Sequence, residues 1–191
     1  MSWLIIGLVL FLGIHSIRIV AEPLRQRAIG SLGLWPYKGV YSVISVIGFV
    51  LIVIGYGQAR LDPVVLYQPP AFLRHVNMLL MLIVFPALLA AYLPGRVKNA
   101  LKHPMLIAVK AWALSHLLVN GMLADVVLFG GFLAWAVFDR ISVKRRTAPS
   151  TQPQLPATVF NDVIVIVGGL GLYAAFAFWL HPILIGVPVM G

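Results

Sequence analysis

The sequence has 191 residues, of which 61% are hydrophobic and only 10% are charged. Soluble domains carry about 25% charged residues, so this composition excludes a soluble globular fold, and the high apolar fraction excludes intrinsic disorder. The formal net charge is +9 and no cysteine is present. In an apolar chain such a charge is typical of cytoplasmic membrane-protein loops rather than of nucleic-acid binding, and disulfides and iron–sulfur clusters are excluded.

Six apolar stretches approach the length of about 20 residues that a helix needs to cross a bilayer. They cover residues 3–21, 39–57, 75–93, 104–120, 123–138 and 162–180. The fifth stretch is short, and the turn at Asn120-Gly121 predicts that the fourth and fifth form an antiparallel hairpin. The sequence therefore predicts an all-α, polytopic transmembrane bundle of about six spans, in a single domain over residues 1–191.

The basic residues predict an orientation in the membrane. Most of them lie in three alternate connections, at Arg25, Arg27, Lys38, Arg96, Lys98, Lys102, Arg140, Lys144, Arg145 and Arg146. The opposite side holds only Arg60 and Arg74. The positive-inside rule then places both termini outside the cytoplasm, with residues 140–160, which are rich in Pro, Ser and Thr from 147 onward, as a cytoplasmic linker.

Pairs of small residues four apart occur in two of the predicted spans. Gly130 and Ala134 form one pair, and Gly171 and Ala175 form the other. Such pairs let transmembrane helices approach closely, so they are consistent with a bundle and say nothing more specific.

Two of the five histidines lie well inside apolar spans, where ionisable groups are costly and often functional. The other three, His75, His103 and His181, lie at span ends, where they reach water or lipid headgroups. His15 and His116 are each about 18 Å along their helices. Because those helices run in opposite directions, the two rings differ in depth by about 6 Å and are able to meet at one site.

Two facing histidines on separate spans are the usual protein ligands of a b-type haem. Neutral imidazole suits iron, and helical bundles hold such cofactors between their helices. Iron ligation would also make His15 and His116 the residues that carry the chemistry. The alternative is that two buried histidines simply form hydrogen bonds across helices.

The surroundings of these histidines are compatible with a cofactor. Trp112, His116 and Asn120 follow one another at helical spacing on one face, and Asn120 is placed to orient an imidazole. Arg18 and Lys110 lie on the cytoplasmic side of the two histidines, where they are placed to pair with haem propionates. The alternative is that both side chains simply extend along their helices and place their charges at the inner membrane interface.

Several of these residues also carry a family resemblance. The first-helix His15-Ser16-Ile17-Arg18, the pair Arg74-His75, and above all the block from Lys102 to Phe132 (KHPMLIAVKAWALSHLLVNGMLADVVLFGGF) resemble the NnrU family. That family includes the zeta-carotene isomerases of plants and cyanobacteria. The resemblance extends over nearly the whole chain in helix order, and implies a protein of the bacterial inner membrane.

The resemblance implies haem b ligated by the histidines that match His15 and His116. In the isomerases this haem supports cis–trans isomerisation of a conjugated bond, and the bacterial branch is associated with denitrification. Ala113 stands here where the isomerases have a cysteine, and Met122 stands where many bacterial relatives have an aspartate after Asn-Gly, with Asp125 as the nearest acid.

Three functions follow from these observations. The first is a haem-b membrane protein with redox or isomerase chemistry, acting on a hydrophobic polyene or isoprenoid lipid. The second is a cofactor-free accessory protein that supports expression or assembly of nitrite and nitric oxide reductases. A transporter is the weakest interpretation, because the sequence shows no internal repeat.

Overall fold

A computed structural model describes residues 1–145 and 156–189, and these residues are almost entirely helical, as predicted. The chain forms two compact units. The first joins Met1–Pro70 to His116–Thr147, and the second joins Ala71–Ser115 to Ala148–Gly191. The prediction of a single domain over residues 1–191 stays a prediction.

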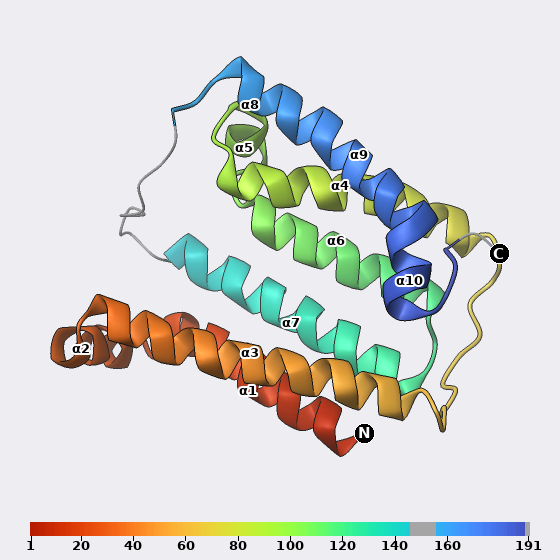
Figure 1. The fold of residues 1–191 in the computed structure, drawn as a ribbon, viewed down its shortest axis with the longest axis horizontal. Helices are drawn as coiled ribbons and strands as arrows, with labels where there is room; N and C mark the ends of the chain where they lie inside the picture. The colour runs from red at the N-terminus through yellow and green to blue at the C-terminus, as the bar shows by residue number, and fades with distance from the viewer. Residues whose placement is uncertain (146–155, 190–191) are drawn as a thin grey trace. The chain divides into compact units, whose positions relative to one another are not determined.

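The first unit is built from three long helices and one short one (Figure 1). They are α1 (Ser2–Val20), α2 (Glu22–Leu32), α3 (Leu34–Ala59) and α7 (Leu123–Arg145). The polar helix α2 connects α1 to α3, and Gly33 turns the chain between α2 and α3 with a φ of 87°, in the left-handed region that favours glycine.

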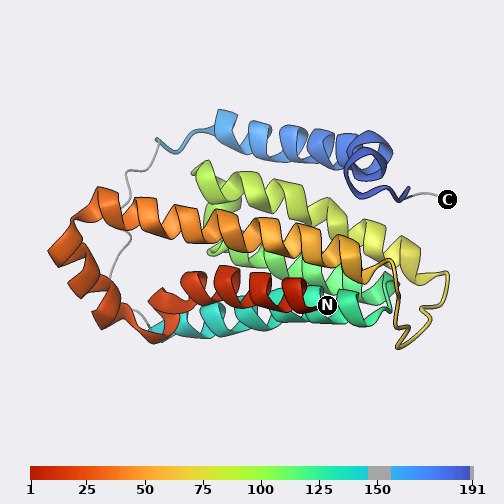
Figure 2. The ribbon, with the colours of Figure 1, turned by 60° about the horizontal axis from the view of Figure 1, so that its bottom comes forward.

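Glycines let α1 and α3 pack with their backbones in contact (Figure 2). A Cβ atom added to Gly7 would lie 2.6 Å from the backbone nitrogen of Ile52, and one added to Gly48 would lie 2.8 Å from that of Phe11. Gly55 is as close to Leu4. Without side chains at these positions the helices approach more closely than ordinary packing allows.

At one end of the first unit, the loop after α3 is joined to the turn before α7. Val65 and Met122 form an isolated antiparallel bridge. The Gly121 carbonyl accepts hydrogen bonds from the backbone N–H groups of Leu66 (2.8 Å) and Tyr67 (3.2 Å). Gly121 also lies against the Tyr67 carbonyl, so this turn has no room for a side chain.

The second unit contains the remaining helices. They are α4 (Leu73–Tyr92), α5 (Arg96–Leu101), most of α6 (Pro104–Val119), and a final segment of α8 (Val159–Val163), η1 (Ile164–Gly168), α9 (Gly169–Ala175), η2 (Phe176–Leu180) and α10 (His181–Ile185). Gly169 packs against the backbone of Pro86 in α4, where a Cβ would lie 2.6 Å from the Pro86 nitrogen. The Asp162 carboxylate accepts hydrogen bonds from the backbone N–H groups of Arg96 (3.1 Å) and Val97 (3.0 Å) at the start of α5.

Within residues 1–145 and 156–189, five helical segments are long and apolar enough to cross a membrane, so the membrane-helical fold is confirmed. They are Ser2–Val20, Leu34–Ala59, Leu73–Tyr92, Leu123–Arg145 and Val159–Ile185. The short helix is the fourth predicted span, Pro104–Val119, rather than the fifth. The helix of the fifth predicted span continues past its apolar part to Arg145. The start of the predicted linker is therefore helical. Residues 146–155 of that linker lie outside the described residues.

The pairs of small residues do not mark the close contacts. A Cβ at Gly130 or Gly171 would meet nothing within 4 Å, whereas Gly7, Gly48 and Gly169 touch neighbouring backbones. Spacing along one helix shows which residues share a face, but it does not show which face turns toward a partner.

Candidate functional site

His15 lies half-buried among aromatic rings in the first unit. Its ring stacks on Phe11, with 4.3 Å between centroids, and lies 5.2 Å from the ring of Tyr41 on α3 and 6.2 Å from that of Trp135 on α7. Nδ1 lies 2.6 Å from the backbone carbonyl of Phe11. Because a carbonyl only accepts, this contact places the proton on Nδ1 and leaves Nε2 as the atom with a free lone pair.

Trp135 contributes an unusual feature beside His15. Its Nε1 atom is buried, and it has no hydrogen-bond partner among the described residues. A buried donor without an acceptor costs about 1–3 kcal/mol, and most such groups in native proteins have a specific reason. The region around His15 therefore holds one donor that a bound group with an oxygen acceptor would satisfy.

His116 lies near the end of α6 and stacks on Phe129 of α7, with 4.6 Å between ring centroids. Phe129 in turn packs edge-on against Tyr56 of α3, at 6.4 Å. The backbone carbonyl of His116 accepts a hydrogen bond of 2.9 Å from the N–H of Asn120, just after the end of α6. Both predicted ligands thus lie in the same compact unit, each against a ring of α7.

The two histidines contact α7 at different levels. Phe129, beside His116, and Trp135, beside His15, are six residues apart, or about 9 Å along the helix axis. Phe132 lies midway between them on α7 and contacts Phe11 at 5.7 Å. The α7 contacts of the two histidines are thus farther apart along the helix than the 6 Å difference in depth expected from sequence, and Phe132 lies between these contacts.

A buried acid lies close to the His116 end of this arrangement. Asp125 is only 3% exposed, and it accepts hydrogen bonds from the Tyr56 hydroxyl (2.6 Å) and from the backbone N–H of Met122 (3.0 Å). In the adjoining loop, the Tyr67 hydroxyl donates toward the carbonyls of Leu117 and Asn120. Burial, followed by the charge of Asp125, raises the pKa of Tyr67, so that hydroxyl stays a neutral donor.

The cations and polar residues predicted around the site divide between the two units. Arg18 and Asn120 belong to the first unit, where Arg18 is exposed on the last turn of α1. Lys110 and Trp112 belong to the second unit, where Lys110 is half-buried and Trp112 packs against the core formed by Val84, Ala87 and Ala108. The roles predicted for these four residues stay predictions.

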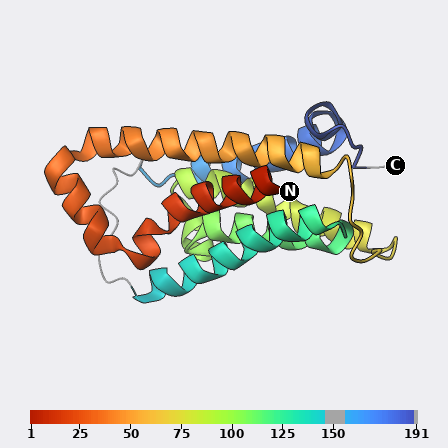
Figure 3. The same cartoon turned by 90° about the horizontal axis from the view of Figure 1, so that it is seen from below.

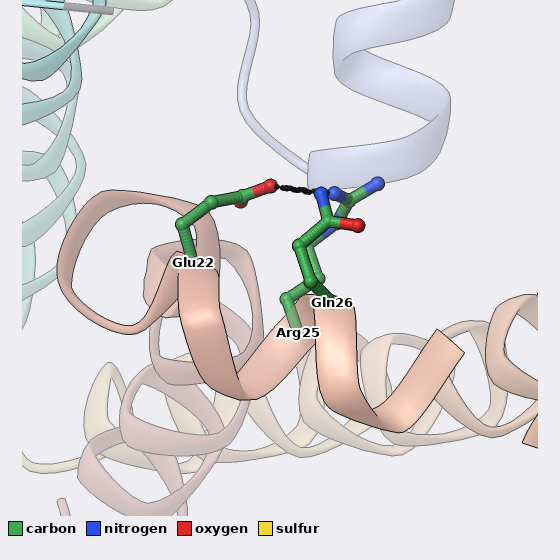
Figure 4. A network of polar contacts seen from close by, with 3 residues as sticks. All are labelled: Glu22, Arg25 and Gln26. Carbon is green, nitrogen blue, oxygen red and sulfur yellow. Dashed lines mark hydrogen bonds and ion pairs between the residues drawn. The ribbon is translucent and has the colours of Figure 1, made fainter. Parts of the chain in front are cut away.

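A polar network lies at the start of α2 (Figure 4). The Glu22 carboxylate accepts hydrogen bonds from Arg25 (2.9 Å) and Gln26 (2.6 Å). Desolvation by itself raises the pKa of Glu22, but the Gln26 hydrogen bond and the charges of Arg25 and Arg18 outweigh it, so the pKa lies below its usual value. Glu22 is thus a carboxylate at neutral pH.

The described residues do not gather their metal-binding side chains into one cluster. No group of three or more His, Cys, Asp or Glu side chains gathers anywhere in residues 1–145 and 156–189, so that part of the chain offers no cage for a bare metal ion. A porphyrin already supplies four ligands, and two imidazoles are enough to complete its iron. An Nδ1–H bonded to a backbone carbonyl, as in His15, is the usual way of orienting a metal-binding imidazole.

Comparison with known families identifies the chain. The profile of the NnrU protein family matches residues 3–189. The chain belongs to the NnrU family. No curated protein and no solved structure matches it. The predicted family is therefore confirmed, together with the membrane-helical fold. The relation of this family to the carotene isomerases stays a prediction.

Sequence reasoning missed the aromatic part of this site. Phe129, Phe132 and Trp135 recur at intervals of three residues, which places them along one face of α7. Phe11 precedes His15 by one turn of α1. Aromatic residues at such spacing next to a buried histidine are the signal that would have pointed to them.

Proposed function

We propose that this NnrU-family protein binds haem b in the membrane, with His15 and His116 as the residues that would hold its iron. The observation that carries the proposal is the anchored imidazole of His15, whose Nδ1–H is held by the Phe11 carbonyl while Nε2 is left for iron. The buried, unpartnered N–H of Trp135 supports it, because a haem carboxylate or another bound oxygen would satisfy that donor.

When bound, the haem supplies one-electron redox chemistry or a Lewis acid for the isomerisation of a conjugated polyene or isoprenoid lipid. The chain's own residues bind and shield it. Phe11 and Phe129 pack against the two imidazoles and exclude water, and Arg18 pairs with a propionate. Phe132 lies between the α7 contacts of the two histidines, so its side chain would border the bound group.

The test is the haem content of histidine variants of the detergent-purified protein, expressed with added haem. His15→Ala and His116→Ala are each expected to abolish low-spin haem binding. His75→Ala is the matched control, because His75 lies in the first turn of α4 and is not a proposed ligand; it should retain full haem. Full haem in the double variant of His15 and His116 would contradict the proposal.

A haem-free wild-type protein would instead favour the accessory function. In that case the helix surfaces would support the expression or assembly of nitrite and nitric oxide reductases in the bacterial inner membrane. His15 and His116 would then serve packing alone, and the histidine variants would change thermal stability without changing any spectrum.

A further inference from the structure

The first unit has a groove lined by residues of α1 and α7. Figure 3 shows the helices around it, with α1 between α3 and α7. The volume of the groove is about 630 Å³. On α1 it extends from Leu8 to Val20, twelve residues or about 18 Å along the helix. On α7 it is lined by Trp135 and Phe138.

The groove is shaped for an apolar chain. Gly13 forms part of its wall, and a Cβ added there would meet nothing within 4 Å. Val20 is 80% exposed and Phe138 is 63% exposed, although both lie on membrane-length helices. Their surroundings in a bilayer are lipid, and a chain lying in the groove would gain the dispersion contacts that an empty groove lacks.

Positive charge gathers at the end of the unit toward which the groove leads. This end, formed by the last turns of α1 and α7 together with α2 and the start of α3, carries Arg18, Arg25, Arg27, Lys38, Arg140, Lys144 and Arg145. Only Glu22 and Asp139 oppose these cations there. Such an excess attracts anionic lipid headgroups.

Arg145 is the cation best placed to contact the headgroup of a lipid that lies in the groove. It follows Phe138 by seven residues, two helical turns, and therefore lies on the same face of α7. Arg145 is exposed and forms no ion pair within the described residues. Lys144, by contrast, lies about a third of a turn away around the helix.

We propose that this groove is a binding site for an anionic glycerophospholipid, with one acyl chain along α1 and the phosphate at Arg145. The apolar walls alone would accept any lipid chain, including a neutral polyene. The cationic end favours the anionic lipid, because a neutral chain leaves Arg145 without a counter-ion. The site shares Trp135 with the proposed haem site, but neither the acyl-chain contacts nor the phosphate contact use His15 or His116.

The experiment is native mass spectrometry of the delipidated, detergent-purified full chain, titrated with phosphatidylglycerol or phosphatidylcholine carrying the same acyl chains. The wild type is expected to bind the first phosphatidylglycerol more tightly than the first phosphatidylcholine. Arg145→Gln should reduce this preference about fivefold, the effect of one cation near an anionic headgroup. Gly13→Leu, which fills the groove, should weaken binding of both lipids.

Two controls match these variants. Lys144→Gln removes the same charge from another face of α7, and Gly57→Leu adds the same side chain at a glycine of α3 that also has nothing within 4 Å. Both should bind lipid as the wild type does. Equal losses in Arg145→Gln and Lys144→Gln, or unchanged binding in Gly13→Leu, would overturn the proposal. Because the readout is lipid mass, the titration is carried out on haem-free protein, and its result stands whether or not the haem proposal holds.

Discussion

Helix α1 has two different sides. Toward α3 it is closed, because Gly7, Gly48 and Gly55 bring the two backbones into contact. Toward α7 it leaves a groove of about 630 Å³. The first arrangement fixes the position of the helix and tolerates no added atom, whereas the second leaves space for a ligand. Rigidity and binding capacity are thus divided between two faces of a single helix.

His15 lies between these two sides. Its ring contacts Tyr41 of α3 and Trp135 of α7, and its Nδ1 is tied to the backbone of α1 itself. The close α1–α3 contact holds the imidazole in place, while the open side gives access. A ligand-binding histidine benefits from both, since binding needs a fixed donor atom and an entry path.

The largest effect is expected from adding a side chain on the closed side. Gly48→Leu would force its Cβ to within 2.8 Å of the Phe11 backbone, and neither helix can yield. Overpacking of this kind costs about 3 kcal/mol or more, so we expect a large drop in the thermal unfolding midpoint in detergent. Gly57→Leu should unfold as the wild type does; equal midpoints for the two variants would show that the α1–α3 contact is not tight.

The second effect concerns the anchor between α3 and α7. Asp125→Ala removes the acceptor of the Tyr56 hydroxyl and of the Met122 N–H. Leaving buried donors unsatisfied costs about 1–3 kcal/mol, measured as a lower unfolding midpoint. In the Tyr56→Phe background the same substitution should cost less stability, because one of the two donors is gone. An equal loss of stability in both backgrounds would show that the Tyr56–Asp125 hydrogen bond does not stabilise the fold.

A smaller effect of opposite sign is expected at Trp135. Trp135→Phe keeps an aromatic ring but removes the buried, unpartnered N–H, so the haem-free protein should gain about 1 kcal/mol of stability. In the haem-bound protein the gain should disappear, because the cofactor then satisfies the donor. Equal gains in the two forms would show that Trp135 has no role toward the bound group.

The smallest effect is expected at α2, away from both sides of α1. The pKa of Glu22 is lowered in the folded state, so its carboxylate stabilises the fold above the unfolded value of about 4.3, and this contribution is lost as the pH falls through the folded value. Glu22→Gln should lower the unfolding midpoint slightly at pH 7 and not at pH 3. A difference in unfolding midpoint between the wild type and Glu22→Gln that grows toward low pH would contradict this prediction.

Hydropathy predicted the membrane helices because crossing a bilayer requires apolar length, a property of each segment alone. It did not predict α2 and α5, which are too short and polar for that signal, nor the extension of α7 to Arg145. The spacing of small residues singled out Gly130 and Gly171, whereas the close contacts between helices lie at Gly7 and Gly48. Contacts between helices depend on how each helix is rotated, which periodicity within one helix leaves open.

The two histidines of the candidate site were predicted from sequence, but the aromatic residues around them were not. His15 and His116 stand out from sequence because ionisable groups inside apolar spans are rare. Phe11, Phe132 and Trp135 do not, because aromatic residues are common in such spans. The hydrogen bond that orients His15 depends on its side-chain rotamer, which sequence alone does not give.

The most direct test of the central claim is a visible absorption spectrum of the purified protein, oxidised and then reduced with dithionite. The haem proposal predicts sharp α and β bands of a low-spin, bis-histidine haem b in the reduced form. A featureless spectrum after expression with added haem would contradict it.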